Sequence, residues 1–260
     1  MRIRATVAAV SGALALSAFA VPAAHAAPAA PNVTFSNMKV NGGKAITLGA
    51  TSTVKVKATY TVTHPATVSM STILTGPVLY RGTSAKYADT QVVSDDPGTC
   101  TKVNSTTVSC SATITIPAGE LYNSDAGTWK KGGVAADSKT GADKWQSDLG
   151  TVPVRRAAKL STDAAPEPVS KGKAITVTGK LTRADWSHGT YAAFGGQSVK
   201  LQFRKAGSST YTTVKTVTSS STGALKTTVT AGSDGYYRYS FAGTSTTSAV
   251  SATGDYVDVR

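Results

Sequence analysis

Apolar and polar residues alternate along much of the chain, and no window shows a sustained helical period. Residues 53–62 read T-V-K-V-K-A-T-Y-T-V, so Val54, Val56 and Ala58 fall on one face and the lysines on the other. Successive side chains of a β-strand point to opposite faces of a sheet. The pattern therefore predicts a strand with one buried face.

The most regular alternation lies in residues 224–260. A run A-L-K-T-T-V-T-A is separated by G-S-D-G from a run Y-Y-R-Y-S-F-A-G. Two alternating runs joined by a Gly/Asp turn are typical of a β-hairpin, because glycine tolerates a positive φ. The final run, S-A-T-G-D-Y-V-D-V-R, predicts a further strand beside them.

Low charge density (16% charged residues) and abundant Thr, Ser, Val, Ala and Gly favour an all-β fold with many turns. The length suits two ordinary domains. We expect antiparallel β-sandwiches over residues 32–156 and 157–260, after a disordered lead-in at 27–31. The junction after Arg155 and Arg156 is very short, which predicts restricted bending between the domains.

The first 26 residues have the organisation of a secretory signal peptide. A basic start with Arg2 and Arg4 precedes an apolar run of small residues, and Ala24, His25 and Ala26 provide a cleavage site. We expect cleavage after Ala26 and no membrane anchor in the mature chain. The protein would then be secreted, and either extracellular or loosely associated with the cell wall.

Two resemblances to known families follow from motifs in the two halves. The first half resembles the closing hairpin of bacterial immunoglobulin-like domains, carried by Gly127, Trp129, Ala136, Asp137, Gly141, Val152 and Val154. The second half resembles β-sandwich modules of secreted actinobacterial proteins, carried by Lys171, Gly172, Thr178, Gly179 and residues 196–204, 234–238 and 243–246. The resemblance implies two tandem immunoglobulin-like sandwiches in a secreted protein of Streptomyces-like bacteria. In the first half the pair Gly132 and Gly133 departs from the family pattern and suggests a β-bulge.

The chain is basic, with a formal net charge of +13, which becomes +11 without Arg2 and Arg4. The charge is spread over both halves. A basic exported protein is attracted to polyanions such as anionic cell-wall polymers, although ordinary solubility explains the charge equally well. Extracellular polysaccharide is the other partner that we consider. The compartment, and the lack of a basic stripe interleaved with aromatic residues, argue against nucleic acid as a partner. No protein partner is indicated.

Cys100 and Cys110 are the two cysteines of the chain. An even pair in an exported protein predicts a disulfide. Val103 and Val108 flank Asn104 and Ser105 between them, so we expect the bond to close a hairpin.

No arrangement of residues indicates catalysis, a metal or a cofactor. The histidines of the mature chain stand apart from potential ligands, and no Gly-x-Ser-x-Gly elbow is present. Weak calcium binding is a minor alternative, either at Asp89, Asp95 and Asp96 or at Asp137 and Asp143, although aspartates more often cap turns.

Residues 185–196, D-W-S-H-G-T-Y-A-A-F-G-G, predict a long aromatic loop. Trp186, His188, Tyr191 and Phe194 could form a ligand-binding surface that stacks on sugar rings. Alternatively, Trp186 and Phe194 fold back and plug one end of the sandwich.

The sequence favours a non-catalytic secreted protein with a structural, adhesive or interaction role at the cell envelope. A binding module for polysaccharide or anionic wall polymer is the main alternative. Weak calcium binding, a secreted enzyme, or a protease inhibitor that uses the Cys100 to Cys110 loop as bait are lower alternatives.

Overall fold

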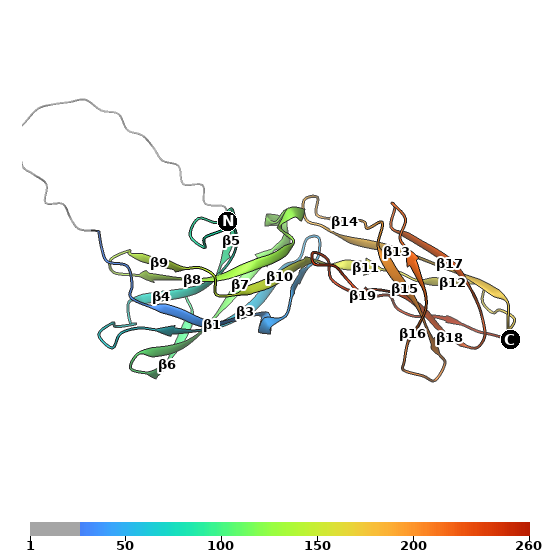
Figure 1. Cartoon of the computed structure of the whole chain (residues 1–260), viewed down its shortest axis with the longest axis horizontal. Coiled ribbons are helices and arrows are strands. Elements are labelled where there is room, and N and C mark those ends of the chain that lie inside the picture. Colours follow the sequence, from blue (N-terminus) through green and yellow to red (C-terminus); the bar gives the residue numbers. More distant parts are fainter. Residues whose placement is uncertain (1–26) are drawn as a thin grey trace, which may run out of the picture.

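The computed structural model describes residues 27–260, and the predicted signal peptide lies outside the described residues. The described part is all-β, with three short 3₁₀ turns and no α-helix. Two sandwiches follow one another along the chain and lie end to end (Figure 1). No helix in this part is long and apolar enough to cross a membrane.

Ten strands make up the first sandwich. They are β1 (Thr34–Val40), β2 (Ile46–Leu48), β3 (Thr53–Thr63), β4 (Ile73–Arg81), β5 (Thr90–Val93), β6 (Thr99–Asn104), β7 (Thr107–Pro117), β8 (Gly127–Asp137), β9 (Asp143–Gln146) and β10 (Thr151–Arg156). One sheet has the order β1-β3-β7-β6, and the other has the order β2-β10-β8-β4-β5, with β9 beside β8. These two orders reproduce the layout of an immunoglobulin sandwich with an added edge strand.

The second sandwich contains the remaining ten strands. They are β11 (Ala158–Leu160), β12 (Asp163–Ala165), β13 (Ala174–Asp185), β14 (Thr190–Ala193), β15 (Ser198–Lys205), β16 (Thr212–Thr218), β17 (Ala224–Thr230), β18 (Gly235–Phe241), β19 (Val250–Ser251) and β20 (Asp255–Val257). Strands β11, β12, β14 and β17 pair with β13, and the facing sheet has the order β16-β15-β18-β19, with β20 on β18.

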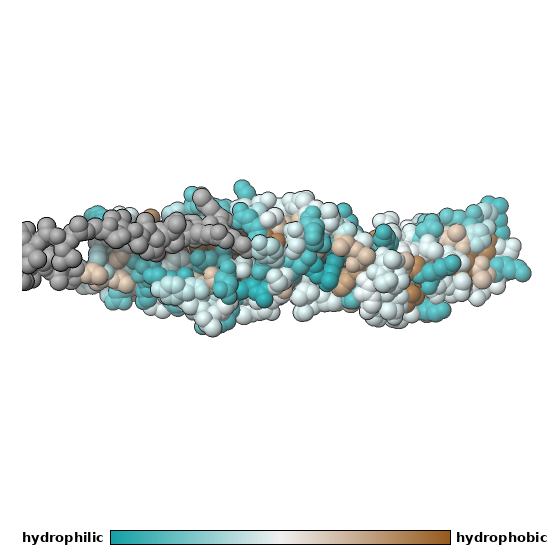
Figure 2. Space-filling model, turned by 90° about the horizontal axis from the view of Figure 1, so that it is seen from above, coloured by the Kyte–Doolittle hydropathy of each residue, from teal (hydrophilic) through white to brown (hydrophobic). Residues whose placement is uncertain are grey.

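The alternating faces become the two cores. In β3 the side chains of Val56 and Ala58 are buried and Val54 is partly buried against the core, while Lys55 and Lys57 are exposed, as the pattern predicted. Trp129 on β8 is fully buried in the first core, and Tyr239 on β18 is fully buried in the second core. Outside the cores the surface is largely polar. The face drawn in Figure 2 is mostly teal and white where the described residues are visible, with small scattered brown patches.

The hairpin predicted within residues 224–241 is wrong. Strand β17 pairs with β13, whereas β18 pairs with β15 in the opposite sheet. The turn between them therefore carries the chain from one sheet to the other. Alternation identified the buried face of each strand correctly, but it carries no information about the strand's partner.

The predicted bulge at Gly132 and Gly133 is also absent, because β4 and β8 pair in continuous register through both residues. The glycines have a packing role instead. A Cβ on Gly133 would lie 2.5 Å from the ring of Phe35, and one on Gly132 would lie 2.8 Å from the carbonyl oxygen of Gln146. The missing side chains leave room for Phe35 between the sheets.

Candidate functional site

The chain passes from one sandwich to the other without a linker. Arg156 is the last residue of β10, and Ala158 begins β11. The amide of Arg156 donates to the carbonyl of Thr246 at 3.0 Å, and its carbonyl accepts from the amide of Ser248 at 2.9 Å. The last residue of the first sandwich is thus paired with the backbone of the second.

The side chain of Arg156 is buried at this junction, with 7% of its surface exposed. Burial lowers its pKa, as does the neighbouring Arg183 guanidinium, while Asp185 acts in the opposite direction. Its buried Nε has no hydrogen-bond partner. Because burying such a cation is unfavourable by itself, the packing around it must offset the cost.

Trp186 is a second buried side chain at the end of the first sandwich. It follows β13 in the second sandwich, yet only 3% of its surface is exposed and it packs in the core cluster of the first sandwich. Its indole Nε1 donates to the carbonyl oxygens of Gly49 at 3.1 Å and of Leu48 at 3.4 Å. The ring therefore joins the second sandwich to the end of the first.

Asn123, in the short 3₁₀ turn Asn123–Asp125, holds the same loop from the other side. Its Nδ2 donates to Oδ1 of Asp185 at 2.7 Å, and its Oδ1 accepts from the amide of Trp186 at 3.0 Å. Its own amide donates to Oγ of Ser187 at 3.2 Å. The hydrogen bond from Asn123, followed by that from His188, lowers the pKa of the Asp185 carboxyl.

The four residues predicted as a ligand-binding loop do not form one exposed surface. Trp186 is in the junction, and Phe194 is 7% exposed and meets Phe241 edge to face in the second core. Tyr191 is half-buried under the ammonium of Lys159, 3.9 Å from the ring centroid, whereas the His188 side chain is 76% exposed. A ligand role for Tyr191 and His188 stays a prediction.

Part of the predicted loop is a strand. Residues of β14 pair with the end of β13, so that Trp186 lies at the tip of a hairpin. This hairpin aims the indole away from its own sandwich. The alternative interpretation of the loop expected Trp186 to fold back into its own sandwich. The ring is buried, but it packs into the first sandwich.

The predicted disulfide is confirmed. Cys100 and Cys110 are bonded and occupy directly paired positions of β6 and β7. The bond therefore joins neighbouring strands of one sheet, unlike the inter-sheet bond of antibody domains. A structural disulfide is typical of proteins outside the reducing cytoplasm.

Three of the five aspartates considered for calcium have local partners. Asp95 accepts from the amide of Thr115 at 3.0 Å, Asp137 accepts from the amide of Lys139 at 2.8 Å, and Asp143 lies 3.1 Å from the ammonium of Lys86. Within residues 27–260, no three His, Cys, Asp or Glu side chains come together as a metal site requires.

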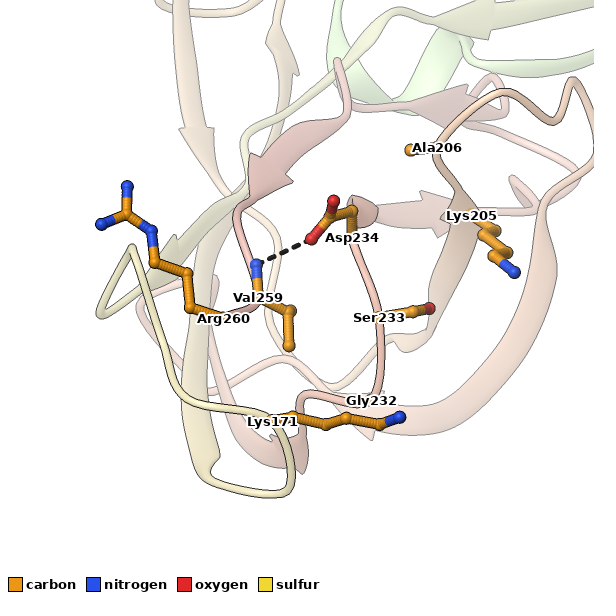
Figure 3. Close-up of a pocket in the computed structure, with 8 residues that line it drawn as sticks. All are labelled: Lys171, Lys205, Ala206, Gly232, Ser233, Asp234, Val259 and Arg260. Carbon is orange, nitrogen blue, oxygen red and sulfur yellow. Dashed lines mark hydrogen bonds between the residues drawn. The ribbon is translucent and has the colours of Figure 1, made fainter.

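A pocket of about 340 Å³ lies at the far end of the second sandwich. Its rim carries three cationic side chains, those of Lys171, Lys205 and Arg260, with Asp234 between them. Figure 3 shows the cationic groups pointing in different directions, while Asp234 accepts from the amide of Val259 at 2.8 Å. Cationic groups that point in different directions do not form a binding site for an anion.

The junction partners Leu48, Asn123 and Thr246 were not identified from the sequence. They lie far along the chain from the residues they contact, with 63 positions between Asn123 and Trp186. No local pattern marks such a contact. The short spacer after Arg156 was the available signal, and it predicted restricted bending without naming the contacts.

No protein-family model and no curated protein matches the chain. Among solved structures it resembles FdeC, an Escherichia coli adhesin, at 13% identity and a TM-score of 0.38, over 89% of this chain and 65% of that one. The D00-D0 domain of intimin is 15% identical with a TM-score of 0.27, over 86% and 99% of the two chains. The fibronectin(III)-like modules of Clostridium thermocellum CbhA are 12% identical with a TM-score of 0.29, over 85% and 92%. At this level the likenesses concern β-sandwich folds alone and do not identify a function.

Proposed function

We propose that this chain is a non-catalytic secreted protein that serves as a rigid structural or adhesive element at the cell envelope. The observation that carries the proposal is the junction, where Trp186 of the second sandwich is buried in the core of the first. Two sandwiches fixed end to end hold their far ends at a constant separation. That property suits a protein that spaces or presents surfaces outside the cell.

The disulfide and the charge support the same role. A cross-strand bond between Cys100 and Cys110 suits an oxidising compartment. The mature chain would carry +11, which is the +13 of the full sequence less Arg2 and Arg4. Attraction between such a chain and anionic wall polymers acts over about a Debye length, roughly 10 Å at 0.1 M salt.

The test is sedimentation of residues 27–260 with purified Gram-positive cell walls at low and high salt, beside insoluble chitin and cellulose. The proposal expects association with walls that weakens as salt rises. Absence of binding to walls at every salt concentration would contradict an envelope role. Turnover of a polymer, ester or peptide by the pure protein would contradict the non-catalytic part.

A further inference from the structure

A row of aromatic and cationic side chains crosses the outer face of the second sandwich. Register pairs Arg204 of β15 with Tyr236 of β18, and Tyr236 with Tyr256 of β20. The Arg204 guanidinium lies 4.1 Å from the ring centroid of Tyr236, whose centroid is 5.1 Å from that of Tyr256. Residues at alternate positions point into the core, so this row faces solvent.

A second pair lies beside the row. Arg238 is opposite Gln202, and its Nε donates to Gln202 Oε1 at 2.9 Å. The ring of Tyr211 covers this guanidinium, with 3.7 Å between Cζ and the ring centroid. The hydroxyl of Tyr211 reaches Gly254, where an added Cβ would be only 2.2 Å away. Tyr211 is thus held across the sheet, and Gly254 leaves space for it.

The two guanidinium groups have no acidic partner. Within the described part of the chain neither Arg204 nor Arg238 forms an ion pair with a carboxylate. Two carboxylates that act on Tyr256 have partners of their own: Asp234 accepts from the Val259 amide at 2.8 Å, and Asp258 pairs with Arg260 at 2.9 Å. The positive charge of this face is therefore available to a ligand.

From this arrangement we propose that the face formed by Arg204, Tyr211, Tyr236, Arg238 and Tyr256, here called the Tyr–Arg face, binds an acidic polysaccharide. Ring faces and edges held in fixed positions provide contact area for sugar rings at little entropic cost. A guanidinium fork matches the geometry of a sugar carboxylate. This inference deepens the proposed envelope role and rests on it for the attraction to anionic polymers. Titration with polygalacturonate tests the Tyr–Arg face separately from binding to cell walls.

Charge and chemistry together select this ligand. A neutral sugar chain would leave both guanidinium groups without a counter-charge, and an acidic peptide would leave the rings without a stacking partner. A chain of uronic-acid sugars supplies a ring and a carboxylate in each unit. The repeated spacing of Tyr and Arg across three strands suits such a repeating ligand.

The test is calorimetric titration of residues 27–260 with three probes. They are polygalacturonate, which has rings and carboxylates, dextran, which has rings alone, and polyglutamate, which has carboxylates alone. We expect polygalacturonate to bind at least tenfold more tightly than either control. Equal binding of polyglutamate would show a response to charge alone and would overturn the proposal, as would absence of polygalacturonate binding.

Variants place the binding on this face. Tyr256→Ala is expected to weaken polygalacturonate binding about tenfold with little change in Tm, because the ring is 40% exposed. Tyr87→Ala is the matched control, since Tyr87 is 80% exposed on the first sandwich. Arg238→Lys keeps the charge but loses the planar fork, and should also weaken binding. Equal losses of polygalacturonate affinity in Tyr256→Ala and Tyr87→Ala would refute the assignment. Unchanged affinity in Tyr256→Ala, or in Arg238→Lys, would also refute it.

Discussion

The indole Nε1 of Trp186 donates to the carbonyl oxygen of Gly49 at 3.1 Å, although 137 positions separate the two residues. Trp186 belongs to the second sandwich and Gly49 to the first. This contact, together with the burial of the ring, joins the two sandwiches. The proposed envelope role depends on it.

Removing the ring should loosen the junction. Trp186→Ala is expected to cost about 3 kcal/mol of unfolding free energy, because a buried tryptophan is lost, and to separate the denaturation of the two sandwiches into two steps. Trp186→Phe keeps most of the packing and loses the hydrogen bonds to Leu48 and Gly49, so it should cost less. Urea denaturation followed by fluorescence and circular dichroism measures both.

Trp145→Ala is the matched control for this prediction. Trp145 is partly buried and packs against a small cluster in the first sandwich, away from the junction. Its loss should destabilise that sandwich without uncoupling the two. A single cooperative transition in Trp186→Ala, unchanged in midpoint, would contradict the role given to the ring.

Acid should weaken the junction through Asp185. The hydrogen bond from Asn123, with a smaller contribution from His188, lowers the pKa of this carboxyl in the folded state. The resulting stability is present above the unfolded pKa of about 4 and is lost as pH falls through the lower folded value. Asp185→Asn should therefore show a shallower loss of Tm below pH 4 than the natural chain.

The same pH series on Asp96→Asn is the comparison, since Asp96 is exposed and outside the junction. Parallel curves of Tm against pH for the natural chain and Asp185→Asn would show that Asp185 does not cause the loss of stability in acid. A steeper loss of Tm in acid for Asp185→Asn than for the natural chain would be the opposite of the expected result.

Alkali should act on the second core through Tyr239. Its hydroxyl donates to the carbonyl of Val177 at 3.0 Å, and burial raises its pKa from 10.0 to about 12. This contribution to stability is complete below pH 10 and is lost as pH rises toward 12. Tyr239→Phe should cost about 1 kcal/mol at neutral pH and flatten the alkaline loss, while Tyr87→Phe should change neither. An unchanged alkaline slope in Tyr239→Phe would refute this.

The disulfide should stabilise the first sandwich. Cys100 and Cys110 close a short loop with a sequence separation of 10, and the chain-entropy model gives about 3 kcal/mol for such a loop. Replacing both cysteines by alanine should lower the free energy of unfolding by that amount, and in the Trp186→Ala background it should shift the transition of the first sandwich alone. A loss confined to the second sandwich, or none, would contradict the assignment.

Much of the fold follows from the sequence, because alternation reports burial directly. The strand over residues 53–62 was predicted on that basis and is confirmed. The hairpin at Cys100 and Cys110 was predicted from the even cysteine count and is also confirmed. Pairing between sheets was not recoverable. The runs around residues 224–241 looked like a hairpin because a turn that crosses between sheets contains the same glycine and aspartate residues.

The candidate sites, like the fold, could be predicted only in part from the sequence. Trp186 stood out as a large aromatic residue, but whether it was exposed depended on Leu48 and Gly49, which are distant in sequence. The Tyr–Arg face was missed because Tyr236 and Arg238 alternate with buried tyrosines and read as an ordinary strand. Only the register with Arg204 brings the aromatic and cationic groups into one row.

The central claim is that the two sandwiches form one rigid body, and pulsed electron–electron distance measurement tests it most directly. Nitroxide labels would be attached at Lys57→Cys in the first sandwich and Lys226→Cys in the second, both exposed positions, with the native disulfide left intact. We predict a single narrow distance distribution that broadens in the Trp186→Ala background. A broad distribution in the otherwise natural chain, unaltered by Trp186→Ala, would contradict a rigid junction.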